Sequence, residues 1–357
     1  MGNVDGGAAV SAEFAKWASL SLLVIQNSSL FVVTRYSRLP AEDGMLYLSS
    51  VVVLVVEICK MLICLGLIVW SSSGVGNASR SVRHHLWTER DQTARLAVPA
   101  ICYAVQNNLV FVAISNLSAA AAQVIYQLKT LTTALFSVLL LGKTFLPAQW
   151  ASFVVLGAGV VLVQSQDAKS ASAPTGASPM LGVAAAVAAA TLSGFAGVYL
   201  ERMFTSGATS LWMRNVQLGI FAIPLQIAAI YHNDAEAVQQ FGLLQGFKGS
   251  TWLVVLVQVA GALLTAIVIK FAGNVLKTFA TVLALLCTCF ASMLLFDFAP
   301  TTLFGVGIAA TAFSIWLYAS PTLRAQAAAR RQQAMVGGAD EEDAMTPLVA
   351  QEMQPLK

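Results

Sequence analysis

Long apolar segments alternate with short polar connections along most of this chain. Ten of the segments approach or exceed the about 20 apolar residues that an α-helix needs to cross a bilayer. Because a segment in lipid must satisfy its own backbone hydrogen bonds, helices are favoured. The pattern predicts an all-α membrane protein with ten transmembrane helices. The predicted helices occupy residues 14–33, 44–70, 95–115, 118–140, 147–163, 180–203, 211–231, 250–271, 275–296 and 301–319.

Composition agrees with this prediction. Hydrophobic residues make up 57% of the 357 residues, charged residues make up 10%, and the mean hydropathy is +0.74, which excludes an ordinary soluble domain. All five cysteines fall in apolar runs, at spacings that match neither a disulfide framework nor a zinc site. No phosphate-binding loop or hydrolase triad is visible, so we expect no catalytic residues, no metal and no cofactor.

A linker divides the predicted helices almost in half. Residues 164–179 are rich in Ser, Ala, Pro and Gly, a composition that cannot form a core. We therefore predict one ten-helix domain over residues 1–320, with halves at about 1–163 and 180–320. Residues 321–357 have too few large apolar residues to fold alone and are predicted to form a disordered tail.

Basic residues gather on one side of the predicted helices. Ten spans place both termini on the same side, and cytosolic connections carry the excess of Lys and Arg. Both termini and the tail are therefore predicted to be cytosolic. Their side carries Lys16, Arg80, Arg83, Arg90, Arg95, Lys143, Arg202, Arg324, Arg330, Arg331 and Lys357, and the other side carries Arg35, Arg38, Lys169 and Lys248.

One lysine interrupts the fourth predicted helix. Lys129 is eleven residues from either end of segment 118–140, about 16 Å from the nearest interface, too far for its side chain to reach the headgroups. A charge at this depth costs about 2.5–3.5 kcal/mol, so it should face a wet cavity or an anion. Polar residues at spacings of three or four share its helix face and predict a polar pathway. They are Gln123, Tyr126, Thr130, Thr133 and Ser137.

Other charged residues have simpler interpretations. Glu57 and Lys60 are three residues apart and predict an ion pair on one helix face, with a substrate role as the alternative. His84 and His85 fall in a connection rich in arginine and are expected to be solvated rather than to bind a metal. Glu57 is the one acidic residue predicted at depth, which disfavours a cation-coupled pump and favours an anionic substrate.

The tripeptide Leu-Lys-Thr occurs at residues 128–130 and again at 276–278. Each copy opens an apolar segment, followed by a proline-containing turn and a glycine-spaced apolar segment. Because each half holds five predicted helices, an odd number, the second half would enter the membrane upside down. The pattern predicts two inverted five-helix repeats, with Lys129 and Lys277 approaching one central site. The alternative is that unrelated membrane helices look alike by composition.

Several motifs together resemble those of the nucleotide-sugar transporters. They are YAVQNN at 103–108, YQLK at 126–129, QW at 149–150, SGFAGVYLE at 193–201, SLWMRNVQLG at 210–219, and Lys270, Asn274, Lys277 and Phe279. They cover nearly the whole membrane region and are most similar to the UDP-galactose, UDP-N-acetylglucosamine and CMP-sialic acid carriers of the Golgi. The resemblance implies the ten-helix drug/metabolite-transporter fold in the Golgi membrane, and exchange of a nucleotide sugar for a nucleoside monophosphate.

The resemblance also implies a set of substrate-binding residues. Their amide groups suit base or ribose, Tyr126 suits an aromatic face, and the lysines suit phosphate. Ala122, Gly273 and Thr278 depart from the family pattern and leave the sugar less defined than the nucleotide. The implied residues are Tyr103, Asn108, Tyr126, Lys129, Gly194, Asn215, Lys270 and Lys277.

Three functions compete at this point. An antiporter of UDP-galactose or UDP-N-acetylglucosamine, or of CMP-sialic acid, explains the lysines, the repeat and the motifs together. A drug or phosphometabolite carrier of the same fold explains only the lysines and the repeat, and a membrane enzyme would need reactive side chains that the sequence does not show. The expected partners are the nucleotide sugar, the nucleoside monophosphate and the lipid bilayer, with no nucleic acid. Whether the protein also forms a homodimer is left open by the sequence.

Overall fold

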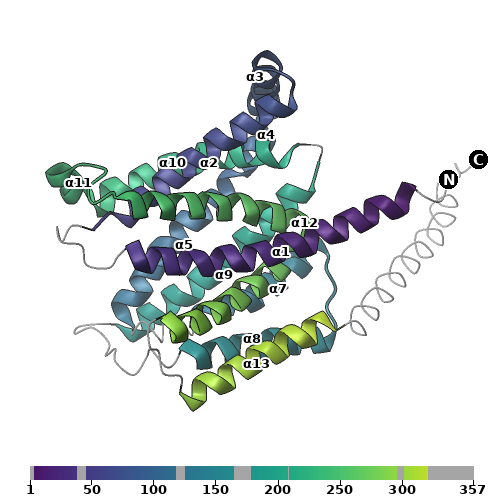
Figure 1. Cartoon of the computed structure of the whole chain (residues 1–357), viewed down its shortest axis with the longest axis vertical. Coiled ribbons are helices and arrows are strands. Elements are labelled where there is room, and N and C mark those ends of the chain that lie inside the picture. Colours follow the sequence, from purple (N-terminus) through teal and green to yellow (C-terminus); the bar gives the residue numbers. More distant parts are fainter. Residues whose placement is uncertain are drawn as a thin grey trace, which may run out of the picture.

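The computed structural model describes residues 4–37, 46–117, 125–164, 178–207, 209–295 and 301–320. All regular elements among these residues are helices, and six of them are long and apolar enough to cross a membrane. The predicted all-helical membrane architecture is confirmed at this level, and the ten-helix repeat stays a prediction. The helices form a bundle (Figure 1). Their bounds are α1 Val4–Ser37, α2 Ser49–Ser71, α3 Val75–Arg83, the π-helix η1 His84–Thr88, α4 Arg90–Arg95, α5 Ala97–Asn116, α7 Leu128–Leu141, α8 Pro147–Gln164, α9 Pro179–Thr205, α10 Leu211–Asn233, α11 Ala235–Phe241, α12 Gly249–Leu295 and α13 Thr302–Ala319.

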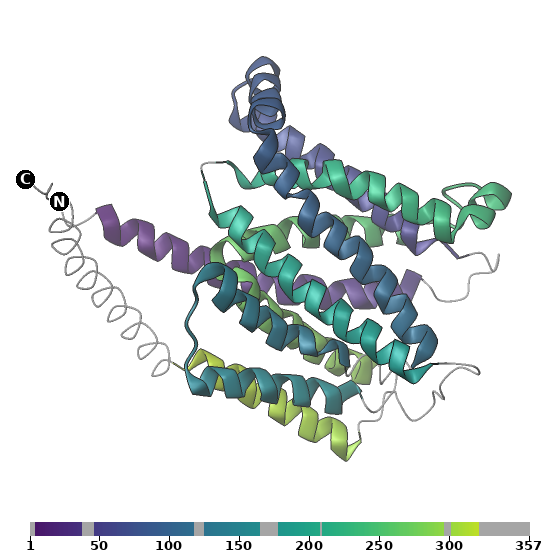
Figure 2. The same ribbon diagram turned by 180° about the vertical axis from the view of Figure 1, so that it is seen from behind.

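Packing between helix pairs builds the bundle. α1 packs along α12, α5 and α7 along α9, α2 along α10, and α8 along α13. Figure 2 shows α8 and α13 side by side at one edge of the bundle. Glycines bring these two helices close, since a Cβ atom on Gly159 would lie 2.8 Å from the backbone nitrogen of Thr311. Most of the predicted linker 164–179, and all of the predicted tail 321–357, lie outside the described residues.

The predicted helices 250–271 and 275–296 form one element, α12, with a sharp bend at Gly273. Its backbone there has φ 80° and ψ 165°, a conformation that residues with a Cβ rarely adopt. A Cβ atom would also lie 2.6 Å from Oε1 of Glu201. The chain turns back at the bend, so both limbs of α12 extend from it toward the same side of the bundle (Figure 1).

Glu201 of α9 joins three parts of the chain at this bend. Its carboxylate forms an ion pair with Lys143 in the turn between α7 and α8, and its Oε2 accepts a hydrogen bond from the Asn274 amide at 2.9 Å. Glu201 is only 5% exposed. The sequence named only Glu57 as an acidic residue at depth, and Glu201, near the end of α9, is a second acidic side chain that the fold buries.

The connection after α2 is not the open loop that the sequence predicted. It folds as α3, η1 and α4, a lobe of residues 75–95 that packs on α10. Arg214 of α10 is 2% exposed and donates to Oε1 of Gln92 at 2.7 Å. Nδ1 of His85 lies 2.7 Å from Oε2 of Glu89, and this hydrogen bond lowers the pKa of the Glu89 carboxyl. Among the described residues no cluster could hold a metal ion.

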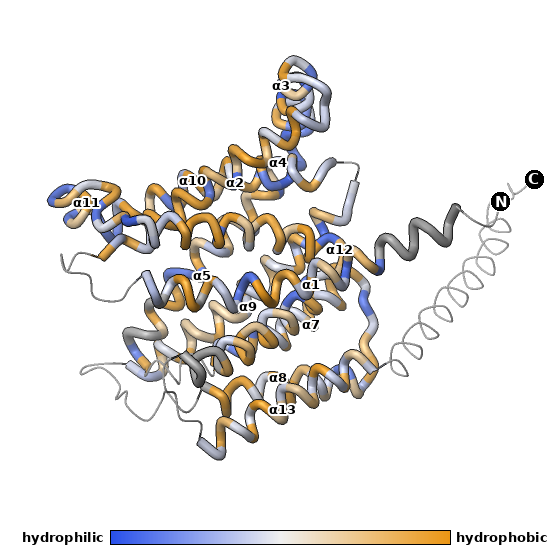
Figure 3. Tube along the Cα trace, viewed as in Figure 1, coloured by the Kyte–Doolittle hydropathy of each residue, from blue (hydrophilic) through white to orange (hydrophobic). Residues whose placement is uncertain are grey.

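Figure 3 shows the sequence pattern on the fold: apolar residues run along the helices, and hydrophilic residues gather on the α3–α4 lobe and around α11.

Candidate functional site

A cavity of about 550 Å³ lies among α5, α7, α9 and the second limb of α12. Its wall combines apolar side chains with aromatic, hydroxyl, amide and ammonium groups. Such a mixture is typical of a site that encloses a small polar ligand. The polar and aromatic lining residues are Tyr103, Tyr126, Gln127, Lys129, Thr133, Ser193, Asn274, Lys277, Thr278 and Thr281.

Lys129 enters the cavity from the start of a helix. The sequence predicted one uninterrupted helix over 118–140, but α7 begins at Leu128, and the Thr130 amide bonds to the Gln127 carbonyl three residues back, at 3.0 Å. Residues 118–124 lie outside the described part of the chain. Residues 125 and 126 are also helical, so the turn at Gln127 is a local break in the helical structure and Lys129 lies two residues after it.

Lys277 stands in the corresponding place on α12. It is the fourth residue after the bend at Gly273, in the first turn of the second limb. Lys129 and Lys277 line the same cavity, and neither lysine forms an ion pair with any described carboxylate. Two like charges without a counter-ion repel each other and are costly to desolvate. An anion between them would offset both costs.

Tyr126 is fixed beside Lys129. Its hydroxyl accepts a hydrogen bond from Nε2 of Gln106 at 2.9 Å and donates to Oγ of Ser193 at 3.3 Å. The Lys129 ammonium lies 4.7 Å from the centre of the Tyr126 ring, a cation–π contact. The phenol thus joins α5 and α9 to the residues that precede α7 on one side of the cavity.

Comparison with known proteins identifies the family. A family model described as "Nucleotide-sugar transporter" matches residues 11–319. The chain is 43% identical over 309 residues to the UDP-N-acetylglucosamine transporter of Rattus norvegicus, covering 85% of this chain and 94% of that protein. It is 40% identical over 331 residues to the UDP-galactose translocator of Canis lupus familiaris, covering 92% and 83%. This chain belongs to the nucleotide-sugar transporter family. The family predicted from the motifs is confirmed, and with it a transporter rather than an enzyme.

A solved structure shares the overall fold of this nucleotide-sugar transporter. It is a crystal structure of a protein with 17% sequence identity and a TM-score of 0.58, covering 89% of this chain and 99% of that chain. At this identity the likeness concerns the fold alone.

The structure brings four of the eight predicted site residues of the transporter into the cavity: Tyr103, Tyr126, Lys129 and Lys277. The other four lie elsewhere. Asn108 is exposed and donates to the Ala104 carbonyl at 2.9 Å, and Asn215 is buried and donates to the Leu211 carbonyl at 2.9 Å. Gly194 packs against Thr132 and Thr133 of α7. Lys270 is exposed beside the Phe271 ring.

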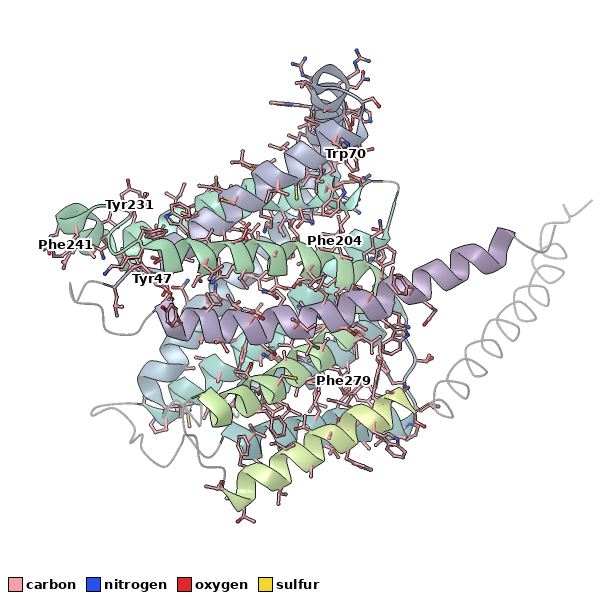
Figure 4. All side chains as sticks on the ribbon, viewed as in Figure 1. Tyr47, Trp70, Phe204, Tyr231, Phe241 and Phe279 are labelled. Atoms are coloured by element: carbon pink, nitrogen blue, oxygen red, sulfur yellow. The ribbon has the colours of Figure 1, made fainter. Side chains whose placement is uncertain are left out.

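A second cavity, of about 1160 Å³, lies among α2, α5 and α10 and includes Asn108. Tyr103 lines both cavities. Tyr47 lines the second cavity at the end of the bundle opposite Phe204 (Figure 4). Lys60 binds both carboxylate oxygens of Glu57, at 2.6 and 2.7 Å, so the predicted ion pair is confirmed.

Several polar residues of the first cavity were not selected as site residues from the sequence, among them Asn274 and Ser193. Asn274 is 3% exposed, packs against Gly197 of α9, and has no hydrogen-bond partner for its buried Oδ1. Ser193 bonds to Tyr126 as described above. Both fall inside quoted motifs, and Asn274 lies three residues before Lys277, so a search for polar neighbours on the same helix face would have found it.

Proposed function

We propose that this chain exchanges a cytosolic UDP-sugar, UDP-galactose or UDP-N-acetylglucosamine, for luminal UMP across the Golgi membrane, with both termini in the cytosol. The names of the relatives support this choice of nucleotide. The excess of Lys and Arg on the side of the termini supports the orientation. CMP-sialic acid, with CMP as the counter-substrate, is the alternative that the motifs left open.

The observation that best supports this proposal is a pair of lysines that line one cavity and form no ion pair with a described carboxylate. We assign the phosphates of the nucleotide sugar to Lys129 and Lys277, each of which follows a break in its helix. In this proposal the lysines supply the charge that the phosphates require. The first amide of the second limb of α12, that of Asn274, is already bonded to Glu201.

The base and ribose belong beside the phosphates in this proposal. The Tyr126 ring offers an aromatic face, and its hydroxyl is already held by Gln106 and Ser193, so it is preorganised for stacking. The unpaired Oδ1 of Asn274 can accept a hydrogen bond from a ribose hydroxyl or from the N3–H of uracil. The second cavity, which shares Tyr103, leaves room for the sugar.

The helix pairs support the inverted repeat. In this repeat α1 corresponds to α9, α2 to α10, α5 to the first limb of α12, α7 to its second limb, and α8 to α13. Each observed contact between helices should then have a symmetric counterpart. α1 contacts both limbs of α12, through Gln26 to the Val257 carbonyl and Ser28 to the Ala284 carbonyl. α9 contacts α5 and α7, as this correspondence requires, whereas the pairs α2–α10 and α8–α13 map onto themselves.

The test is uptake of labelled nucleotide sugars into proteoliposomes that contain the purified full-length chain. UDP-galactose, UDP-N-acetylglucosamine and CMP-sialic acid are compared, with UMP, CMP or no nucleotide inside. We expect uptake of a UDP-sugar that internal UMP accelerates. Uptake of none of the three nucleotide sugars would overturn the proposal, and uptake of CMP-sialic acid alone would decide for the alternative.

A further inference from the structure

An apolar groove of about 340 Å³ lies between the end of α2 and the α3–α4 lobe. Its volume falls in the range of ligand pockets, about 300–1,000 Å³. Its wall is aliphatic and aromatic with one charged side chain, Arg83. The lining residues are Leu65, Val69, Val75, Ala78, Ser79, Val82, Arg83, Leu86 and Trp87.

The helix α3 is strongly two-sided. Val75, Ala78 and Val82 share one face, and Ala78 is 3% exposed in its contact with α2. Arg80 and Arg83 are exposed. A short helix with an apolar face and arginines beside it is suited to lie in the plane of a membrane interface.

The place of the lobe fits this role. It stands at the outer edge of the bundle, at the end of α2 (Figures 1 and 3). Trp70, labelled in Figure 4 next to the lobe, is 82% exposed, and Trp87 is 75% exposed. Tryptophans favour the headgroup level of a bilayer, so these two indicate the height of the interface.

We propose that the groove and its arginines bind one anionic phospholipid, with an acyl chain against Leu65, Val69 and Leu86 and the phosphate at Arg83. Arg80, one turn before Arg83, is placed to contact the second negative group of the headgroup. The lobe carries four arginines against two carboxylates in residues 75–95, and Glu89 is paired with His85. This charge favours an anionic lipid over a zwitterionic one. In the proposed orientation the lobe lies in the cytosolic leaflet, which carries the anionic lipids.

The test is native mass spectrometry of the delipidated full-length protein, to which phosphatidylserine or phosphatidylcholine is added back. We expect one tightly held phosphatidylserine and much weaker retention of phosphatidylcholine. Arg80→Gln with Arg83→Gln should weaken phosphatidylserine binding about 20-fold, since each basic residue near an anionic surface contributes about fivefold. Val82→Trp, which fills the groove and leaves the arginines in place, should also weaken binding.

Arg202→Gln is the matched control, because Arg202 is exposed near the end of α9 and outside the groove. Its phosphatidylserine binding should equal that of the unchanged protein. Surface substitutions of this kind rarely alter stability by more than about 0.5 kcal/mol, so the variants should fold. Equal retention of the two lipids, unchanged binding in the double arginine variant, an equal loss in Arg202→Gln, or displacement by millimolar inorganic phosphate would each overturn the proposal.

Discussion

Replacing Lys129 or Lys277 with Ala should weaken nucleotide binding and leave the empty protein at least as stable. The two effects have opposite signs because neither lysine has a described carboxylate partner and both line the same cavity. Without ligand, removing one ammonium removes a desolvation cost and a repulsion. With ligand, it removes a hydrogen bond to phosphate.

The magnitude follows from that single lost contact. A hydrogen bond to a charged group contributes about 1.5–3 kcal/mol, and 1.4 kcal/mol corresponds to a factor of ten, so affinity should fall about 10- to 150-fold. The assay is inhibition of UDP-sugar uptake by external UMP, together with the melting temperature of the purified variants without nucleotide.

Lys270→Ala provides the control. Lys270 precedes Lys277 by seven residues on the same helical element but is exposed and outside both cavities. Its UMP affinity should be nearly unchanged. The reasoning is refuted if Lys129→Ala and Lys277→Ala keep wild-type affinity, if Lys270→Ala loses as much, or if weaker binding comes with a lower melting temperature.

Three further predictions concern stability and topology. Glu201→Gln should lower the melting temperature, because it leaves Lys143 without its partner at a cost of about 3 kcal/mol. Glu201→Gln with Lys143→Met, which keeps an acceptor for the Asn274 amide, should recover most of the loss. Gly159→Leu should lower the yield of folded protein more than Gly157→Leu, since only Gly159 lies against another helix. In cells, the sequon at Asn77 should stay without glycan, whereas a sequon placed in segment 164–179 should be glycosylated; a glycan on Asn77 would contradict cytosolic termini.

Apolar patterning predicted helix positions well. Segment 211–231 became α10, Leu211–Asn233, and segment 301–319 became α13, Thr302–Ala319. The reason is that a run of apolar residues is a local property, and its length alone decides whether it can cross a bilayer. The family likewise followed from several short motifs taken together.

Breaks within helices could not be predicted in the same way. Polar residues surround both breaks, in QVIYQLKT at 123–130 and KFAGNVLKT at 270–278, but polar residues alone do not specify a break. The bend at Gly273 is held by Glu201, which is 72 residues away in the chain. Side-chain direction was equally hidden. Asn215 lies in one of the family-like motifs, yet its side chain bonds to the Leu211 carbonyl of its own helix. A rotation about the side-chain bonds decides whether such an amide faces a cavity or the backbone, and the sequence does not specify it.

The two lysines also bear on why transport should be an exchange. If the empty cavity closed, Lys129 and Lys277 would be desolvated together without a described counter-ion, at a cost of several kcal/mol per charge. A barrier raised by only about 3 kcal/mol slows the step about 150-fold. A nucleotide sugar or a nucleoside monophosphate supplies phosphate in either direction and removes that cost.

The empty carrier should therefore return slowly, and each inward passage should require an outward passage. Initial uptake of UDP-sugar into proteoliposomes should be much faster with UMP inside than without it, whereas internal uridine, which has the same base and no phosphate, should not accelerate uptake. Uridine is the decisive control, because a carrier gated by base contacts alone would respond to both. Equal rates with UMP and with empty vesicles would show that the lysines bind the anion without controlling the conformational change.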